Sequence, residues 1–179
     1  ARSFALVTGL GYAFTGKSMR QRMISLVACI LYKLAFLRVA RVIFQNRDDQ
    51  ALFIRRGLVP KGRTGVISGS GVDLAHYLPS PLGERPPTRF LTVARITKEK
   101  GIRELIFAAE ELRRRKIDAE VVVVGPIDEN PGAFGDSDMD RLRHSPMIRY
   151  VGALDDVRAE LSSCHAFVLP SYREGTPRS

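Results

Sequence analysis

Short apolar runs alternate along the chain with longer stretches in which apolar residues recur every three or four positions. The short runs predict buried strands, and the longer stretches predict amphipathic helices. Strands are expected at residues 4–8, 41–45, 64–67, 89–94, 119–124, 148–151 and 166–169. Helices are expected at about 18–40, 46–57, 102–116, 136–143 and 155–163. Regular alternation of strands and helices predicts an α/β fold built on parallel sheets.

Local signals support this pattern at several element ends. Asn46 is suited to cap a helix, and Asp48 and Asp49 then lie in its first turn, where carboxylates complement the helix dipole. Gly57 suits the left-handed position after the helix. The run of valines in 119–124 is typical of a parallel strand buried on both faces.

A proline-rich segment divides the pattern into two lobes. Residues 79–87 contain four prolines, which exclude both a helix and a central strand. We therefore expect a first lobe at 1–78, a linker at 79–88 and a second lobe at 89–179. The chain begins Ala-Arg-Ser and ends Pro-Arg-Ser, so we expect both ends to lie inside a longer protein.

The charge is strongly basic, with 28 Lys and Arg against 19 Asp and Glu, a net charge of +9. Such a balance favours nucleic acid, an acidic lipid surface or a phosphorylated substrate. The cations are dispersed, Trp is absent and no RNA-binding motif occurs, so we expect no nucleic-acid partner.

The helix expected at 18–40 is rich in apolar residues and carries several cations. Its apolar residues are spaced three and four apart, at Met23, Val27, Ile30, Leu31, Leu34 and Leu37. Two interpretations remain open: an ordinary core helix, or a helix lying on an anionic membrane surface. Charges interrupt the stretch too often for a membrane span.

Cys29 and Cys164 are far apart in apolar runs and are expected to be buried thiols, and the three histidines are scattered, so we expect no metal site. Gly9, Gly11 and Gly16 follow a strand but lack the spacing of a dinucleotide fingerprint and the acidic residue that should follow. This argues against a nucleotide-cofactor oxidoreductase.

Candidate chemistry lies where the strands of the second lobe end, because ligands of parallel sheets bind beyond the carboxyl ends of strands. The strand at 89–94 is followed by three cations in residues 95–101, which open a helix. Such a loop is either a diphosphate cradle or a solvated turn. Gly125-Pro126 and Gly152 follow the next two strands, and Glu174 lies in the loop after the last one.

Taken in order, these segments resemble the motifs of one enzyme family. Arg95 to Gly101 resembles an R-x-x-x-x-K-G phosphate motif, and residues 170–177 resemble a P-S-x-x-E-G-x-P segment. Gly125-Pro126, Tyr150-Val151-Gly152, Phe44 to Asp49 and Ser70 to Asp73 resemble further landmarks. The chain is similar to the retaining, group 1 (family 4) GT-B glycosyltransferases, and the Gly9 to Phe14 segment most resembles the bacterial branch that builds polysaccharide on undecaprenyl diphosphate.

The resemblance implies a GT-B fold of two Rossmann-like lobes with parallel sheets, here with an incomplete N-terminal lobe and a truncated C-terminal lobe. Residues 1–78 would belong to the acceptor side and 89–179 to the nucleotide-sugar side. The family's E-x7-E element begins at Glu174, so its second glutamate, the donor ribose contact, would lie beyond Ser179.

The resemblance also implies roles for particular residues on the donor side. Arg95 and Lys100 would neutralise the donor diphosphate and stabilise the leaving nucleotide. Gly125, Pro126 and Gly152 would approach the nucleobase.

Glu174 is the expected catalytic-centre residue. With the amides of Gly175 and Thr176 it would hold and orient the donor sugar rather than act as a nucleophile. Gly9, Gly11 and Tyr12 would lie on the acceptor side.

The implied function is transfer of a hexosyl or N-acetylhexosaminyl group from a nucleotide-sugar, a UDP-sugar by family majority. The acceptor would be a polysaccharide precursor or a polyprenyl-diphosphate-linked sugar, without metal or cofactor. We expect a cytoplasmic protein, peripheral on the inner face of the membrane. Two alternatives stay open: an inactive truncated fragment, and another GT-B nucleotide-sugar enzyme such as an epimerase.

Overall fold

The computed structural model describes residues 2–10, 14, 18–69, 71–84, 86–128, 134–172 and 174. Their contacts form two compact units. The first comprises the described residues up to Val72 together with Glu174, and the second runs from Asp73 to Tyr172. The proline-rich segment thus groups with the second unit, and the domain limits drawn from the sequence stay a prediction.

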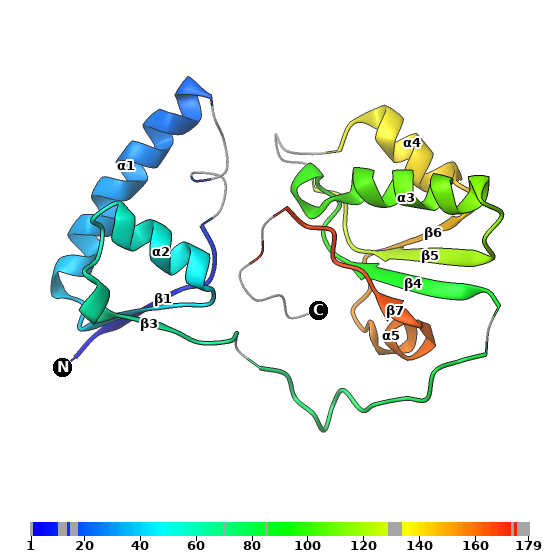
Figure 1. The fold of residues 1–179 in the computed structure, drawn as a ribbon, viewed down its shortest axis with the longest axis horizontal. Helices are drawn as coiled ribbons and strands as arrows, with labels where there is room; N and C mark the ends of the chain where they lie inside the picture. Colours follow the sequence, from blue (N-terminus) through cyan, green and yellow to red (C-terminus); the bar gives the residue numbers. More distant parts are fainter. Residues whose placement is uncertain are drawn as a thin grey trace. The chain divides into compact units, whose positions relative to one another are not determined.

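The first unit is a three-stranded parallel sheet in the order β1-β2-β3. Its strands are β1 (Phe4–Val7), β2 (Arg41–Phe44) and β3 (Thr64–Val66). Two helices, α1 (Met19–Ala35) and α2 (Arg47–Arg55), connect them and lie on the same face of the sheet (Figure 1). Short 3₁₀ turns, η2 (Phe36–Arg38) and η3 (Lys61–Arg63), precede β2 and β3.

Side-chain caps fix where both helices begin. Ser18 caps α1 in a capping box with Gln21, and Asn46 caps α2 by accepting a hydrogen bond of 2.7 Å from the Asp49 backbone N–H. The predicted cap at Asn46 is therefore confirmed. Gly57, with φ of 65°, takes the left-handed conformation expected after α2.

The core of the first unit is an aromatic cluster centred on Phe53 of α2. The ring centroids of Phe14, Tyr32, Phe36 and Phe44 lie 5.1–6.2 Å from that of Phe53. Such tilted and edge-on pairs stabilise a core beyond the area they bury. Tyr32 and Phe36 thus turn one side of α1 and η2 toward the sheet.

This orientation determines which side of α1 packs on the sheet and which side is exposed. The apolar stripe singled out in the sequence, with Met23, Val27, Ile30 and Leu34, lies on the exposed side, and no residue of α1 is fully buried. Among the described residues the stripe therefore lies outside the packed core, although α1 itself packs on that core through Cys29 and Tyr32. Periodicity locates an apolar stripe, but the aromatic cluster around Phe53 determines which side packs. No helix among the described residues is long and apolar enough to span a membrane.

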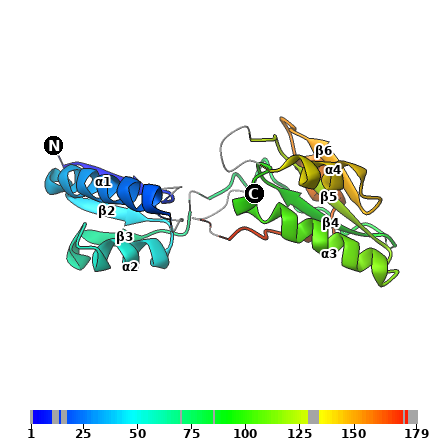
Figure 2. The ribbon, with the colours of Figure 1, turned by 90° about the horizontal axis from the view of Figure 1, so that it is seen from above.

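The second unit is a four-stranded parallel sheet in the order β6-β5-β4-β7. Its strands are β4 (Thr88–Val93), β5 (Ala119–Val124), β6 (Ile148–Gly152) and β7 (Ala166–Phe167). Helices α3 (Ile102–Arg114) and α4 (Asp136–His144) cover one face, and α5 (Arg158–Ser163) covers the other (Figures 1 and 2). Strands β5 and β6 are added on one side of β4 and β7 on the other, so the carboxyl end of β4 is a topological switch point.

The predicted core of the second unit is confirmed. From α3, Leu105, Ile106 and Ala109 are buried against the valines of β5, with Leu112 packed at their margin. The other face of β5 packs beneath α5, so this strand is buried on both faces, as the run of valines predicts. The predicted α/β fold with parallel sheets is confirmed as well.

Two sequence expectations need correction here. The last helix begins at Arg158 instead of Asp155, because the Asp156 side chain accepts a hydrogen bond of 3.0 Å from the Arg158 N–H and so favours a turn. The two cysteines, Cys29 and Cys164, are free thiols but only half-buried, since each lies at the margin of its core.

Candidate functional site

The carboxyl ends of three neighbouring strands meet at one edge of the second sheet. Backbone hydrogen bonds continue past the strands, from Ile96 N–H to the Pro126 carbonyl at 2.9 Å and from Gly125 N–H to the Gly152 carbonyl at 2.7 Å. These bonds bring Arg95, Gly125, Pro126 and Gly152 to the same edge. The structure therefore gathers in one place four residues that the sequence predicts for the donor side.

Gly125 is required by the packing of the protein itself. Its φ is 149°, and a Cβ placed there would lie 1.9 Å from the Ala94 carbonyl oxygen. The Tyr150 hydroxyl donates a 3.0 Å hydrogen bond to the Gly125 carbonyl, and burial raises the pKa of Tyr150, which keeps the phenol protonated as a donor. Contact of Gly125, Pro126 and Gly152 with a nucleobase stays a prediction.

The cationic loop after β4 packs directly against the loop after β7. Within this loop, Lys98–Lys100 form the 3₁₀ turn η4, and Gly101 follows with φ of 69°. A Cβ on Gly101 would lie 2.1 Å from the Pro170 carbonyl oxygen, and Tyr172 N–H donates a 3.0 Å hydrogen bond to the Glu99 carbonyl. We call this contact between residues 95–101 and 170–172 the loop clamp. It places the two motifs of the second lobe side by side.

Side chains from the start of α3 reinforce the loop clamp. The Tyr172 hydroxyl donates to the Glu104 carboxylate, and this hydrogen bond raises the pKa of Tyr172. Arg103 Nε lies 3.0 Å from Asp138 Oδ2 of α4, and that carboxylate raises the pKa of Arg103. The first turn of α3 is thus tied to both the β7 loop and α4, which holds its N-terminal amides in place.

The two cations expected to bind diphosphate lie in different surroundings. Arg95 is 64% exposed at its side chain and forms a 2.7 Å ion pair with Asp128, whose side chain is 10% exposed. Lys100 is half-buried in η4, whereas Lys98 of the same turn is exposed. Cations beside helix N-terminal amides form a favourable setting for phosphate oxygens. The surroundings of Arg95 and Lys100 suit such a ligand.

Two contributors to this edge were missed by sequence reasoning. Asp128, two residues after Pro126, holds Arg95, and only its position after a strand end could have indicated it. Ser171 carries a buried hydroxyl oxygen that has no hydrogen-bond partner among the residues that the structure describes. A buried orphan hydroxyl is unusual, and no sequence pattern predicts it beyond the P-S pair.

The remaining predicted residues fall elsewhere. Glu174 groups with the first unit, where the Asn46 amide donates a 3.4 Å hydrogen bond to its backbone carbonyl. Its expected role beside the donor sugar stays a prediction. Gly9, two residues after β1, is exposed, and its acceptor-side role likewise stays a prediction. Gly11, Tyr12, Gly175 and Thr176 lie outside the described residues.

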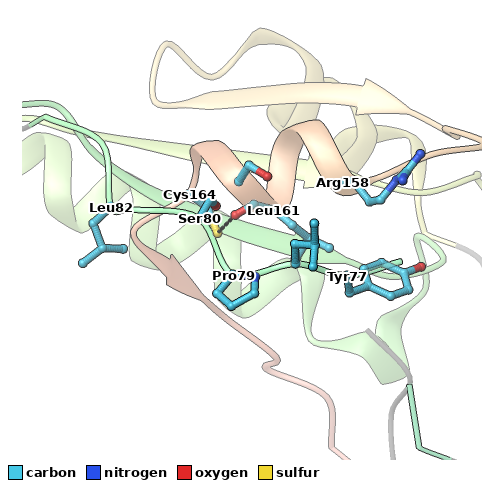
Figure 3. Close-up of a pocket in the computed structure, with 9 residues that line it drawn as sticks. Tyr77, Pro79, Ser80, Leu82, Arg158, Leu161 and Cys164 are labelled. Atoms are coloured by element: carbon cyan, nitrogen blue, oxygen red, sulfur yellow. Dashed lines mark hydrogen bonds between the residues drawn. The ribbon is translucent and has the colours of Figure 1, made fainter. Parts of the chain in front are cut away.

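A separate cavity of about 270 Å³ lies between α5 and the segment from Tyr77 to Leu82 (Figure 3). Cys164 faces it, and its thiol donates a 3.2 Å hydrogen bond to the Leu161 carbonyl while burial raises the pKa of the thiol. The cavity is therefore best explained by packing of the proline-rich segment on α5. Within the described part of the chain, no group of three or more His, Cys, Asp or Glu is arranged to hold a metal ion.

Comparison with known proteins agrees with this geometry. Residues 87–179 match the family of group 1 glycosyl transferases. A curated relative from Campylobacter jejuni, N,N'-diacetylbacillosaminyl-diphospho-undecaprenol alpha-1,3-N-acetylgalactosaminyltransferase, is 31% identical over 188 residues, covering 98% of this chain and 48% of the relative. The chain thus spans about half the length of that relative.

Solved structures show the same fold at low sequence identity. The crystal structure of TarM matches 98% of this chain and 33% of its own with a TM-score of 0.69 and 14% identity. Anabaena HepE in complex with UDP and glucose matches 97% of this chain and 47% of its own, with a TM-score of 0.68 and 18% identity. With its parallel sheets, ordered motifs and family match, this chain belongs to the group 1 glycosyltransferases and has the GT-B fold.

Proposed function

We propose that the protein to which this chain belongs transfers a hexosyl or N-acetylhexosaminyl group from a UDP-sugar to a lipid-linked acceptor, with retention of anomeric configuration. The family match supports sugar transfer. HepE, which shares the fold, is solved with UDP and glucose, and the Campylobacter relative is a diphospho-undecaprenol N-acetylgalactosaminyltransferase. A protein that uses such an acceptor would work at the inner face of the cytoplasmic membrane.

The observation that carries the donor half of the proposal is the loop clamp. Negative charge develops on the diphosphate as the glycosidic bond breaks, and preorganised cations stabilise that charge without moving. Lys100 is fixed in a turn that packs against Pro170, and Arg95 is fixed by Asp128. These two cations would hold the diphosphate, and the Glu174 loop would orient the sugar.

Calorimetric titration of UDP into the full-length protein tests this assignment. Replacing Arg95 or Lys100 by Ala should weaken UDP binding by roughly 1.5–3 kcal/mol each, the worth of a hydrogen bond to a charged group. Lys98→Ala is the matched control, because Lys98 belongs to the same turn but is exposed. Equal affinity of wild type and both Arg95 and Lys100 variants would refute the diphosphate site.

Transfer itself is tested with a UDP-sugar and a polyprenyl-diphosphate-linked acceptor. We expect release of UDP and an NMR coupling constant in the product that matches the donor's anomeric configuration. Activity that persists in a metal chelator would support the proposed metal independence. Epimerisation of the donor without any UDP release would instead support a GT-B epimerase.

A further inference from the structure

The exposed side of α1 is unlike the exposed side of the other long helices. Large apolar residues recur along its outward side every three or four positions and continue into the 3₁₀ turn η2. Each is between 53% and 76% exposed: Met19, Met23, Val27, Ile30, Leu34 and Leu37. Leu26 and Leu31, at 63% and 61% exposed, widen this stripe on either side. We call these eight residues the α1 stripe.

Helices α2 and α3 provide an internal comparison. The exposed residues of α2 include Arg47, Asp48 and Arg55, and those of α3 are mostly charged. The large apolar residue among them is Phe107, which is 52% exposed and has the Arg141 guanidinium 4.5 Å from its ring centroid. In a layered α/β domain the outer side of the helical layer normally faces water and is polar. The α1 stripe departs from that rule.

The charged residues of α1 and η2 that flank the α1 stripe are all cations. Arg20 and Arg38 border it on one side of the helix, and Arg22 and Lys33 border it on the other, as their helical spacing requires. In the sequence, residues 1–47 contain eight Lys and Arg and no Asp or Glu. An apolar stripe edged only by cations complements the surface of an anionic bilayer, where the apolar side chains enter the acyl boundary and the cations meet headgroups.

We propose that the α1 stripe is the surface by which this protein lies on an anionic lipid bilayer. The purpose of that contact rests on the proposed function, since a polyprenyl-linked acceptor is confined to a membrane. The contact itself follows from α1 alone and is measured without any transfer reaction.

The test is co-sedimentation of the full-length protein with vesicles. Vesicles of equal parts phosphatidylglycerol and phosphatidylcholine should bind the protein, and pure phosphatidylcholine should bind it far less. Ile30→Glu combined with Leu34→Glu should abolish vesicle binding while the unfolding temperature and UDP affinity stay at wild-type values. Leu74→Glu is the matched control, because Leu74 is 74% exposed but lies in the second unit, and it should bind vesicles normally.

A second pair of variants does not depend on the apolar stripe. Arg20→Gln combined with Arg22→Gln should weaken binding to the anionic vesicles by about fivefold for each cation. Unchanged binding in this pair, or no binding of the wild type, would overturn the inference.

Two further results would overturn the inference, because each would show that something other than lipid packs against the α1 stripe. A lowered unfolding temperature in the glutamate pair would show that the α1 stripe packs against other parts of the chain. A change in oligomeric state on light scattering would show that a second copy covers it. If vesicle binding fails while UDP binding and sugar transfer to a detergent-dispersed acceptor persist, the inference falls and the proposed function stands.

Discussion

Replacement of Gly101 by Ala tests whether the loop clamp shapes the donor edge. Gly101 has φ of 69°, and an added Cβ would lie 2.1 Å from the Pro170 carbonyl oxygen. Ordinary contact begins at 3.4 Å. The two loops would have to separate by about 1.3 Å, because the obstacle is a backbone carbonyl and no flexible side chain can yield.

The cost has two parts. A left-handed backbone costs a residue with a Cβ roughly 1–2 kcal/mol. Separation of the loops would also break the hydrogen bond from Tyr172 N–H to the Glu99 carbonyl, which is worth about 1 kcal/mol net. We therefore expect Gly101→Ala to lower the free energy of unfolding by about 2–3 kcal/mol. That is within the range observed for single substitutions at buried positions such as Gly101.

The variant Gly57→Ala distinguishes the cost of the left-handed backbone from the cost of the steric clash with Pro170. Gly57 has φ of 65°, almost the same as Gly101, but no atom lies within 4 Å of the position its Cβ would take. The control should therefore lose only the strain part, roughly 1–2 kcal/mol. In the full-length protein the extra 1 kcal/mol should lower the unfolding temperature of Gly101→Ala by roughly 2–4 °C more than that of the control.

The same pair of variants links the clamp to binding. Displacement of the loop moves Lys100, so Gly101→Ala should weaken UDP binding by about tenfold, equivalent to about 1.4 kcal/mol, while Gly57→Ala leaves it unchanged. Differential scanning fluorimetry and calorimetry measure the two effects. Equal unfolding temperatures and equal UDP affinities in the two variants would refute the idea that the Pro170 carbonyl positions this loop.

Three further predictions concern other described residues. Ser171→Ala should leave stability unchanged or raise it by up to about 1 kcal/mol in chemical denaturation, since its buried hydroxyl lacks a partner among the described residues. His165 accepts from Arg89 N–H at 2.9 Å and meets the Gly83 carbonyl at 3.2 Å, so His165→Phe should speed hydrogen exchange at the Arg89 amide. The Glu111 pKa is lowered to about 2 by hydrogen bonds from two arginines, so its stabilising contribution is present above about pH 4.5 and lost toward pH 2. Glu111→Gln should flatten that part of the acid unfolding profile.

The parts of the fold that sequence predicts well are those fixed by near neighbours. Strand β5 matches its predicted bounds, Ala119–Val124, because five of its six positions are Ala or Val and only a doubly buried strand accommodates them. Asn46 caps α2 as predicted, because the cap needs only the backbone three residues later. The start of α5 was predicted three residues too early, because a short-range turn at Asp156 competes with the helix.

The contacts that shape the candidate site are long-range and could not be derived in the same way. Gly101 and Pro170 are 69 positions apart, and only the order of strands around β4 brings their loops together. The pairing of Arg95 with Asp128 likewise depends on the register of β4 with β5. Sequence motifs identified the loops, but not the carbonyl against which Gly101 packs or the carboxylate that holds Arg95.

The described contacts around the loop clamp lie in the second unit, and those around α1 lie in the first. Gly101 packs against Pro170 and Arg95 pairs with Asp128, all within the second unit, whereas Tyr32 and Phe36 pack α1 and η2 against the core of the first unit. Among the described residues the two sets share no packing partner, so the effects of variants in them should add. An α1 variant should change vesicle binding at constant UDP affinity, and a Gly101 variant should do the reverse. A double variant whose effects depart from additivity would show that donor binding and lipid contact are energetically coupled. The loop clamp and the α1 stripe would then not act independently.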